Sequence, residues 1–262
     1  MNNGLVSIIM PSYNTANYIS ESINSVINQS YKNWELIVVD DCSTDNTDEV
    51  IKDFLKDSRI KYLKNKENSG AAISRNKALR IAKGEWIAFL DSDDLWSHKK
   101  LEKQIKFMEQ NNYNFSYTKY GEIDEQGNNL NIEISGPKKI TKFGMYNYCW
   151  LGCLTVMYNR EKIGLIQIKD IKKNNDYAMW LKICKKENCY LYPYSLALYR
   201  KRNGSISRQS YLKLIKWHYK LFREIDNRNI LSSLILTMRN LSFGVIKKIF
   251  YRKQLKNGLN KV

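Results

Sequence analysis

The sequence is short of the residues that cross-link small folds or bind zinc. Its 262 residues include only two histidines, and its five cysteines contain no Cys-x-x-Cys pair. An odd number of cysteines cannot be fully paired within one chain. We therefore exclude a disulfide scaffold or a structural zinc site and expect a reducing, cytosolic setting. The first apolar run has no cationic segment before it and ends at Pro11, so it does not read as a secretory signal.

Prolines and long apolar runs are also scarce. Three prolines, a hydrophobic share of 43% and a charged share of 26% fit a globular chain with a sizeable core, not a disordered or fibrous one. The mean hydropathy of -0.52 argues against a polytopic membrane protein. A chain of 262 residues accommodates one large α/β domain with an appendage, or two small domains.

Acidic residues are nearly absent from the last fifth of the chain. Residues 206–262 contain 13 Lys and Arg against two Asp and Glu, whereas residues 1–100 contain 13 against 14. The formal net charge of +17 suggests nucleic acid, anionic lipid or a polyanionic substrate as a partner. Because the excess lies in the tail, the tail and the rest of the chain need separate explanations.

Short apolar runs alternate with amphipathic stretches in the first hundred residues. The continuous, β-branched run at residues 36–39 is typical of a parallel strand buried on both faces. The alternation predicts an α/β fold with a doubly wound, mostly parallel sheet flanked by helices. Strands are expected at residues 6–10, 36–39, 60–63 and 86–90, and helices at 19–27, from 45 or 47 to 55, at 71–81 and at 99–111.

The alternation weakens after residue 114. We expect a strand at 115–120, a hairpin turn at 125–127, a loop at 136–141, a helix at 177–185 and an extended segment at 191–200. The best boundary is the loop at 202–209. It separates a domain at 1–205 from a basic helical tail at 206–262.

Acidic side chains follow two of the predicted strands directly. Asp40 and Asp41 follow the second strand, and Asp91, Asp93 and Asp94 follow the fourth. Ligands of open parallel sheets collect at the carboxyl ends of the strands, where these carboxylates would repel one another unless a cation met them. An Asp-x-Asp without nearby His or Cys supplies oxygen ligands, which suit Mg²⁺ or Mn²⁺. Helix caps and turns would explain one such cluster, but not two at adjacent strand ends.

These motifs together resemble the inverting family 2 glycosyltransferases, which have the GT-A fold. The resemblance covers residues 5–207 and departs from the family pattern at Asn175, where Glu is common, and at Arg202, where His is common. It rests on the segments SIIMPSYN, ELIVVDDCSTDNT, NSGAAISRNKAL, GEWIAFLDSDDLW, NNDYAMWLKI and YRKRNGSIS, in this order.

The resemblance implies a role for individual residues. Asp176 would be the catalytic base, and Asp93 would bind the Mn²⁺ or Mg²⁺ that bridges the donor diphosphate. Arg200 and Arg202 would face that diphosphate. The nucleotide and donor sugar would be bound by Pro11, Tyr13, Asp41, Gly70, Arg75 and Asp91, with Tyr13 against the base, Asp41 accepting a hydrogen bond from the base and Asp91 near the ribose.

Each assignment has a structural alternative. Asp176 is also a good N-cap for the helix that follows it, and Arg200 and Arg202 are also compatible with surface charges. The aromatic segment 146–150 would form either a sugar-stacking wall or part of the core.

The tail contains apolar residues at helical spacing between 230 and 250. Arg239 and several hydroxyl side chains make this stretch a poor membrane-spanning helix, whereas a basic amphipathic helix lying on an anionic membrane surface fits it. The alternative is that the apolar side packs on the catalytic domain or on a second subunit.

The sequence therefore predicts a metal-dependent, inverting glycosyltransferase. Its donor would be a nucleotide sugar, a UDP-hexose or UDP-N-acetylhexosamine. Its acceptor would be an undecaprenyl-linked glycan in O-antigen, capsule or lipooligosaccharide synthesis, at the cytoplasmic face of the membrane. A non-catalytic nucleotide- or sugar-binding module of the same fold is the alternative. A nucleotidyltransferase would need a Gly-rich, basic loop after the first strand, and this sequence has none. The acidic pocket argues against nucleic acid as a partner.

Overall fold

The structure, a computed structural model, describes residues 4–202 and 211–255. Its strands form one continuous sheet with the order β11-β7-β6-β9-β4-β1-β2-β3, and β10, β5 and β8 pair off this path. The strands are β1 (Val6–Ser12), β2 (Trp34–Asp40), β3 (Ile60–Lys64), β4 (Trp86–Phe89), β5 (Leu95–Trp96), β6 (Phe115–Ile123), β7 (Asn129–Ile134), β8 (Lys139–Ile140), β9 (Met157–Asn159), β10 (Cys189–Arg200) and β11 (Arg252–Gln254).

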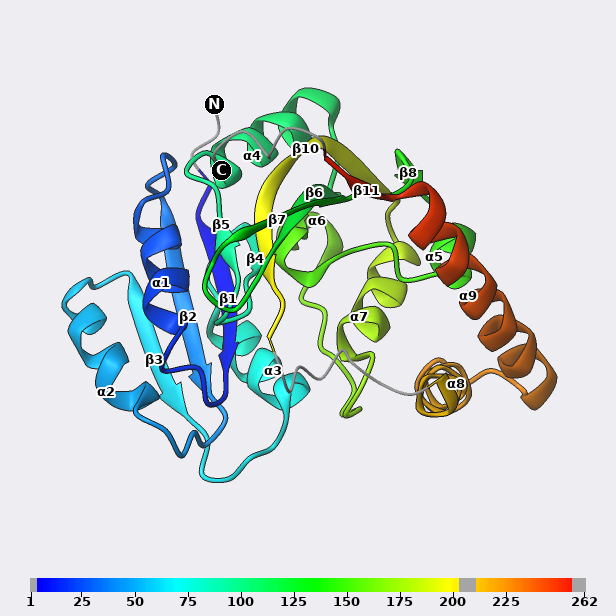
Figure 1. The fold of residues 1–262 in the computed structure, drawn as a ribbon, viewed down its shortest axis with the longest axis horizontal. Helices are drawn as coiled ribbons and strands as arrows, with labels where there is room; N and C mark the ends of the chain where they lie inside the picture. Colours follow the sequence, from blue (N-terminus) through cyan, green and yellow to red (C-terminus); the bar gives the residue numbers. More distant parts are fainter. Residues whose placement is uncertain (1–3, 203–210, 256–262) are drawn as a thin grey trace.

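Helices cover both faces of the sheet (Figure 1). They are α1 (Ile19–Ile27), α2 (Thr47–Lys52), α3 (Ala71–Ile81), α4 (Lys100–Asn111), α5 (Lys142–Asn147), α6 (Arg160–Ile163), α7 (Asn175–Cys184), α8 (Tyr211–Lys220) and α9 (Ile230–Phe250), with short 3₁₀ turns at Asp53–Lys56 and Cys153–Thr155 and a π turn at Leu221–Ile225.

The first half of the sheet is parallel, as the sequence predicts. Strands β4, β1, β2 and β3 lie side by side in the same direction, and Ser12 at the end of β1 pairs in register with Asp40 at the end of β2. Along β1, Ile8 belongs to the core cluster that contains residues of α1 and α4, whereas Ile9 belongs to the cluster that contains residues of α3 and α7. The carboxyl ends of these strands therefore meet at one edge between two helical layers.

The second half of the sheet is mixed. β9 pairs antiparallel with both β4 and β6, and β7 pairs antiparallel with β6, while β10 runs parallel to β6. The segment expected as a loop at 136–141 contains the two-residue strand β8, which is too short to show any alternation of its own. The expected boundary loop begins at Arg202, and its residues 203–209 lie outside the described residues.

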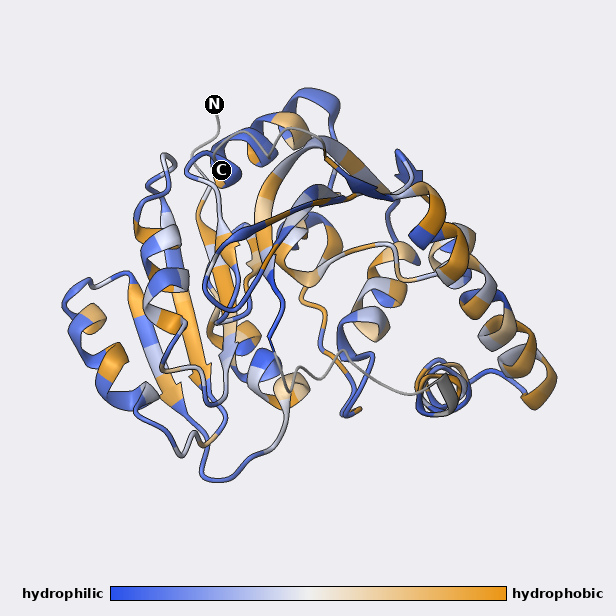
Figure 2. Cartoon of the chain, in the orientation of Figure 1, coloured by the Kyte–Doolittle hydropathy of each residue, from blue (hydrophilic) through white to orange (hydrophobic). Residues whose placement is uncertain are grey.

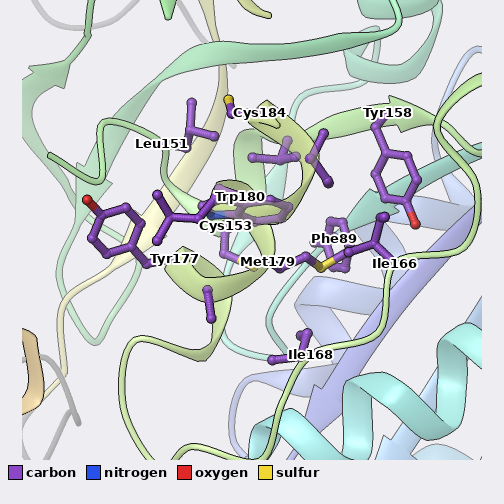
Figure 3. Close-up of a cluster of buried hydrophobic side chains, with 14 of the residues drawn as sticks. Phe89, Leu151, Cys153, Tyr158, Ile166, Ile168, Tyr177, Met179, Trp180 and Cys184 are labelled. Atoms are coloured by element: carbon purple, nitrogen blue, oxygen red, sulfur yellow. The ribbon is translucent and has the colours of Figure 1, made fainter. Parts of the chain in front are cut away.

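Helix α7 is held by an aromatic core. The indole of Trp180 is fully buried, and its ring meets Phe89 of β4 edge to face at a centroid separation of 5.2 Å. Figure 3 shows Trp180 among buried side chains from α7, β4 and the 150–168 region. This packing fixes the position of the helix that begins at Asn175, at the carboxyl edge of the sheet.

The C-terminal segment packs on the domain. The Asn240 amide of α9 donates to the Tyr177 hydroxyl of α7 at 2.9 Å, and the Trp150 ring contacts Phe243 of α9 and Tyr251. β11 then pairs with β7 at the end of the sheet. Figure 2 shows that hydrophobic residues occupy much of the length of α9.

We expect Lys100→Met to stabilise the protein. The Lys100 ammonium is fully buried above the Trp96 ring, 4.0 Å from its centroid, and hydrogen-bonds to no group within the described part of the chain. Burial holds the pKa of Lys100 well below its ordinary value. Removing the amine should raise the free energy of unfolding by about 1 kcal/mol or more.

The pH dependence checks the cause. The unfolded chain protonates this lysine more readily than the folded one, so the wild type loses stability as pH falls below the ordinary lysine pKa. The advantage of Lys100→Met in urea unfolding should therefore be larger at pH 6 than at pH 9. Lys103→Met, on the exposed side of α4, serves as the control. Equal stability of wild type and Lys100→Met at both pH values would contradict the explanation.

Candidate active site

The predicted acidic residues gather at the carboxyl edge of the parallel strands. The backbone amide of Asp41 donates to the Ser12 carbonyl at 2.8 Å, which ties the end of β2 to the end of β1. Tyr13 follows β1 with 44% of its surface exposed, and Pro11 is half-buried within the strand. An exposed aromatic ring thus stands beside buried carboxylates.

Asp41 organises the loop that leads into α3. Its Oδ1 accepts hydrogen bonds from the Asn65 amide (2.8 Å), the Ser69 backbone amide (2.9 Å) and the Ser74 hydroxyl (3.2 Å). Its Oδ2 accepts one, from the Gly70 backbone amide at 2.7 Å. Gly70 has a φ of +89°, in the region that favours glycine, so its residue type suits this turn. Among the described residues, Oδ2 retains acceptor capacity.

Arg75 joins the end of β4 to the start of α7. Its guanidinium donates to Asp91 Oδ1 and to Asn175 Oδ1, each at 2.6 Å, and its side chain is 8% exposed. The sequence placed Arg75 beside the donor but gave no sign of these two contacts. The position at which the family often has Glu thus supplies a neutral amide to the arginine.

Asp176 lies one residue further, in the first turn of α7. Its Oδ1 accepts a hydrogen bond from the backbone amide of Tyr177 at 2.8 Å. Burial raises the pKa of Asp176, the Arg75 guanidinium acts against that rise, and the Asp91 carboxylate adds to it. The expectation that Asp176 caps this helix is wrong, because α7 begins at Asn175 and Asn174 occupies the N-cap position.

Asp93 and Arg202 form an ion pair with an Nε–Oδ2 distance of 2.7 Å. Burial, followed by the charge of Asp91, raises the pKa of Asp93. Asp94 is fully buried and accepts a hydrogen bond from the Arg200 backbone amide at 2.9 Å. Burial, together with the charges of Asp93 and Asp91, holds the pKa of Asp94 well above its ordinary value.

Arg200 is buried behind these carboxylates. Its side chain is 1% exposed, and its Nε donates to the Asp93 carbonyl at 2.9 Å. The other guanidinium nitrogens reach the Glu125 carbonyl at 3.1 Å and Glu21 Oε2 at 2.5 Å. The guanidinium thus braces the Asp-x-Asp backbone, a position that the sequence pattern did not reveal.

The donor set suits a hard divalent cation. Within residues 4–202 and 211–255, no three or more His, Cys, Asp or Glu side chains are grouped to hold a metal. Asp91 and Asp93 offer oxygen atoms only, and the effect of the Asp91 charge on the pKa of Asp93 is of the kind that a cation relieves. A metal here would need further ligands from a bound molecule.

Lys247 is a neighbour that the sequence did not place at the site. It belongs to α9, and its Nζ donates to the Trp150 carbonyl at 2.9 Å. Burial lowers the pKa of Lys247 to about 8, with the carboxylate of Asp176 among the charges that oppose this fall. No signal in the local sequence distinguishes it from Lys248.

The fold is that of the GT-A glycosyltransferases. A solved structure of S. aureus TarS residues 1–349 in complex with UDP-GlcNAc superposes with a TM-score of 0.72 at 23% identity, covering 91% of this chain and 73% of that one. The mannosyltransferase PcManGT from Pyrobaculum calidifontis, in complex with GDP-Man and Mn²⁺, superposes with a TM-score of 0.64 at 18% identity, covering 93% and 75%.

The chain belongs to the family described as glycosyl transferase family 2, whose model matches residues 7–163, and it is a glycosyltransferase. It is 42% identical to the putative teichuronic acid biosynthesis glycosyltransferase TuaG of Bacillus subtilis, covering 87% of this chain and 91% of that one. It is 40% identical to WfgD of Escherichia coli, named a UDP-Glc:alpha-D-GlcNAc-diphosphoundecaprenol beta-1,3-glucosyltransferase, covering 98% and 99%. The predicted fold and family are thus confirmed.

We expect Arg75→Gln to raise the pKa of Asp176 further. The guanidinium favours the charged form of that carboxyl, so its loss leaves burial and the Asp91 charge unopposed. An NMR titration of the Asp176 carboxyl carbon in both proteins measures the change.

Arg80→Gln, on the exposed side of the same helix, is the control and should leave the titration unchanged. A pKa of Asp176 that stays the same or falls in Arg75→Gln would show that the arginine does not set the charge of this site.

Proposed function

We propose that this glycosyltransferase moves a sugar from a UDP-hexose or UDP-N-acetylhexosamine to a lipid-linked glycan acceptor, with inversion at the anomeric carbon. The observation that carries the proposal is the position of Asp176. It lies in the first turn of α7 at the carboxyl edge of the sheet, where the Arg75 contact to Asp91 also lies. A base and a donor pocket thereby share one site.

Asp176 acts as the general base. An acceptor hydroxyl is a weak nucleophile at neutral pH, and a carboxylate within hydrogen-bond reach takes its proton as the oxygen attacks the anomeric carbon. The bond from that carbon to the diphosphate oxygen breaks, and the nucleoside diphosphate leaves with the electron pair. Burial raises the pKa of Asp176, which makes it a stronger base than an exposed aspartate. Displacement in line inverts the configuration without an enzyme nucleophile.

The nucleotide binds along β1, β2 and the start of α3. The exposed ring of Tyr13 packs against the base, with Pro11 shaping the pocket beneath it. Asp41 Oδ2, which has capacity beyond its bond to Gly70, accepts a hydrogen bond from the base. Asp91 lies near the ribose and the donor sugar.

The diphosphate binds beside Asp93 and Arg202. We infer that Asp93 holds Mn²⁺ or Mg²⁺, with the donor phosphates supplying further oxygen ligands. Such an ion stabilises the negative charge on the leaving diphosphate. Arg202, whose side chain is 28% exposed, contacts the phosphates, whereas Arg200 is buried and positions Asp93.

We expect Asp176→Asn and Asp93→Asn each to lower sugar transfer by a factor of about 10² or more, since each removes a charge that acts on the reacting atoms. UDP release from a panel of UDP-sugars measures the rate. Asp170→Asn, at an exposed position before α7, is the control.

Thermal unfolding should show that all three variants remain folded. Near-normal turnover in Asp176→Asn would defeat the assignment of the base and favour a different site. If the wild type binds UDP but transfers sugar from none of the donors in the panel, the result would instead favour the non-catalytic module.

The exposed side of α9 is the basis for proposing that the protein contacts a membrane and uses a lipid-linked acceptor. Eight large apolar side chains of α9 are 49% or more exposed, while its buried positions include hydroxyl and amide side chains. The exposed ones are Ile230, Leu231, Leu234, Ile235, Met238, Val245, Ile249 and Phe250.

The surroundings of α9 are cationic. A hollow of about 320 Å³ between α5 and α9 is lined by Lys142, Arg228 and Arg239 among apolar side chains. By length and composition α9 qualifies as long and apolar enough to cross a membrane. Because its other face packs on α5 and α7, we propose that α9 lies flat on the cytoplasmic leaflet, with cations toward anionic headgroups. The E. coli relatives named for an acceptor on diphosphoundecaprenol support a lipid-linked acceptor here.

We expect the double variant Leu231→Gln/Met238→Gln to bind vesicles of phosphatidylcholine with phosphatidylglycerol at least about tenfold more weakly than the wild type. Both side chains are more than 60% exposed, and each buries apolar area only if the helix meets lipid. Vesicle flotation measures the partition.

The control is Leu55→Gln/Leu165→Gln, which changes two exposed leucines outside the tail. Equal flotation of the two double variants and the wild type would rule out lipid contact through α9.

A further inference from the structure

Lys247 projects from the inner face of α9. Its Nζ donates to the Trp150 carbonyl and lies 5.3 Å from the centre of the Tyr148 ring. Gly244, one turn earlier, lets the helix come close, because a Cβ at that position would stand 3.1 Å from a carbon of the Tyr148 ring. The next residue, Lys248, is exposed. The backbone thus directs one of two adjacent lysines inward.

The inward lysine is the cation near Asp176 that has no acid partner in the described chain. Arg75 pairs with Asp91, and Arg202 pairs with Asp93. For Lys247, the described residues provide a carbonyl and an aromatic face but no ion pair, which leaves ammonium donors for another group. Lys247 lies seven residues after Asn240 and so on the same face of α9, and Asn240 donates to the hydroxyl of Tyr177, the residue next to Asp176.

An apolar side chain would anchor α9 at this position at a lower desolvation cost than a lysine. A half-buried ammonium is useful where an anion arrives. A lysine is a compact charge with three donors, and it commonly binds phosphate. The same helix carries the outer apolar face, so a group attached to a membrane lipid would approach Lys247 along α9.

We infer that Lys247 binds a phosphate of the acceptor, a sugar joined through a diphosphate to a lipid. The inference rests on the proposed function, in which Asp176 takes the proton of a hydroxyl on that same sugar. The hydroxyl and the diphosphate are attached to one ring, so a cation close to the base is within reach of the phosphate. Lys247 then selects diphosphate-bearing acceptors over neutral ones and orients the hydroxyl toward Asp176.

The test compares two water-soluble acceptors in the full-length protein, which removes vesicle binding from the measurement. One is N-acetylglucosamine linked through diphosphate to a short alkyl chain, and the other is the neutral alkyl glycoside of the same sugar. The wild type should show the lower KM for the diphosphate acceptor. Lys247→Met should raise that KM about tenfold or more and leave the KM for the neutral acceptor and for the donor nearly unchanged.

Lys248→Met is the matched control and should behave as the wild type does, while Lys247→Arg should retain most of the preference for the diphosphate acceptor. An equal loss with both acceptors in Lys247→Met would show that the lysine only anchors α9, and an unchanged KM would also overturn the inference. Failure of the wild type to transfer sugar to either acceptor would overturn the proposed acceptor class itself, and the inference with it.

Discussion

The buried guanidinium of Arg75 is the contact on which the site depends. This guanidinium donates to Asp91, just after β4, and to Asn175, at the start of α7, each at 2.6 Å. Its positive charge also opposes the rise in the pKa of Asp176 that burial and the Asp91 carboxylate cause. Only arginine offers two donors in a rigid fork.

Asn175 changes the charge balance of this contact. The family that the sequence resembles often has a glutamate at this position. Arg75 would then pair with two carboxylates, that glutamate and Asp91. The amide accepts the same hydrogen bond at 2.6 Å without adding a negative charge. More of the positive charge of Arg75 is thereby left to act on Asp176. The departure from the family pattern is therefore compatible with an ionised carboxylate at the neighbouring position.

The sequence predicted the parts of the fold that arise from continuous local patterns. The buried run of β2 and the carboxylates directly after it needed no partner to be recognised, because the end of a parallel strand has a known place in such sheets. The burial of Arg200 was not predictable in this way. Its partners Glu21 and Glu125 come from distant segments and meet it only through the crossing of β10 with the sheet edge. The inward position of Lys247 was not predictable for the same reason, since it depends on how α9 packs on the domain.

The hydroxyl of Tyr177 connects the docking of α9 to the helix that carries the proposed base. It donates to the Met145 carbonyl at 2.7 Å and accepts from Asn240, and Tyr177 is the residue next to Asp176. Removing the chain from residue 230 onward, to obtain a more soluble enzyme, would expose this hydroxyl and one side of the Trp150 ring. Such a truncation would destabilise the first turn of α7. The tail is therefore part of the packed domain and not only a membrane-binding segment.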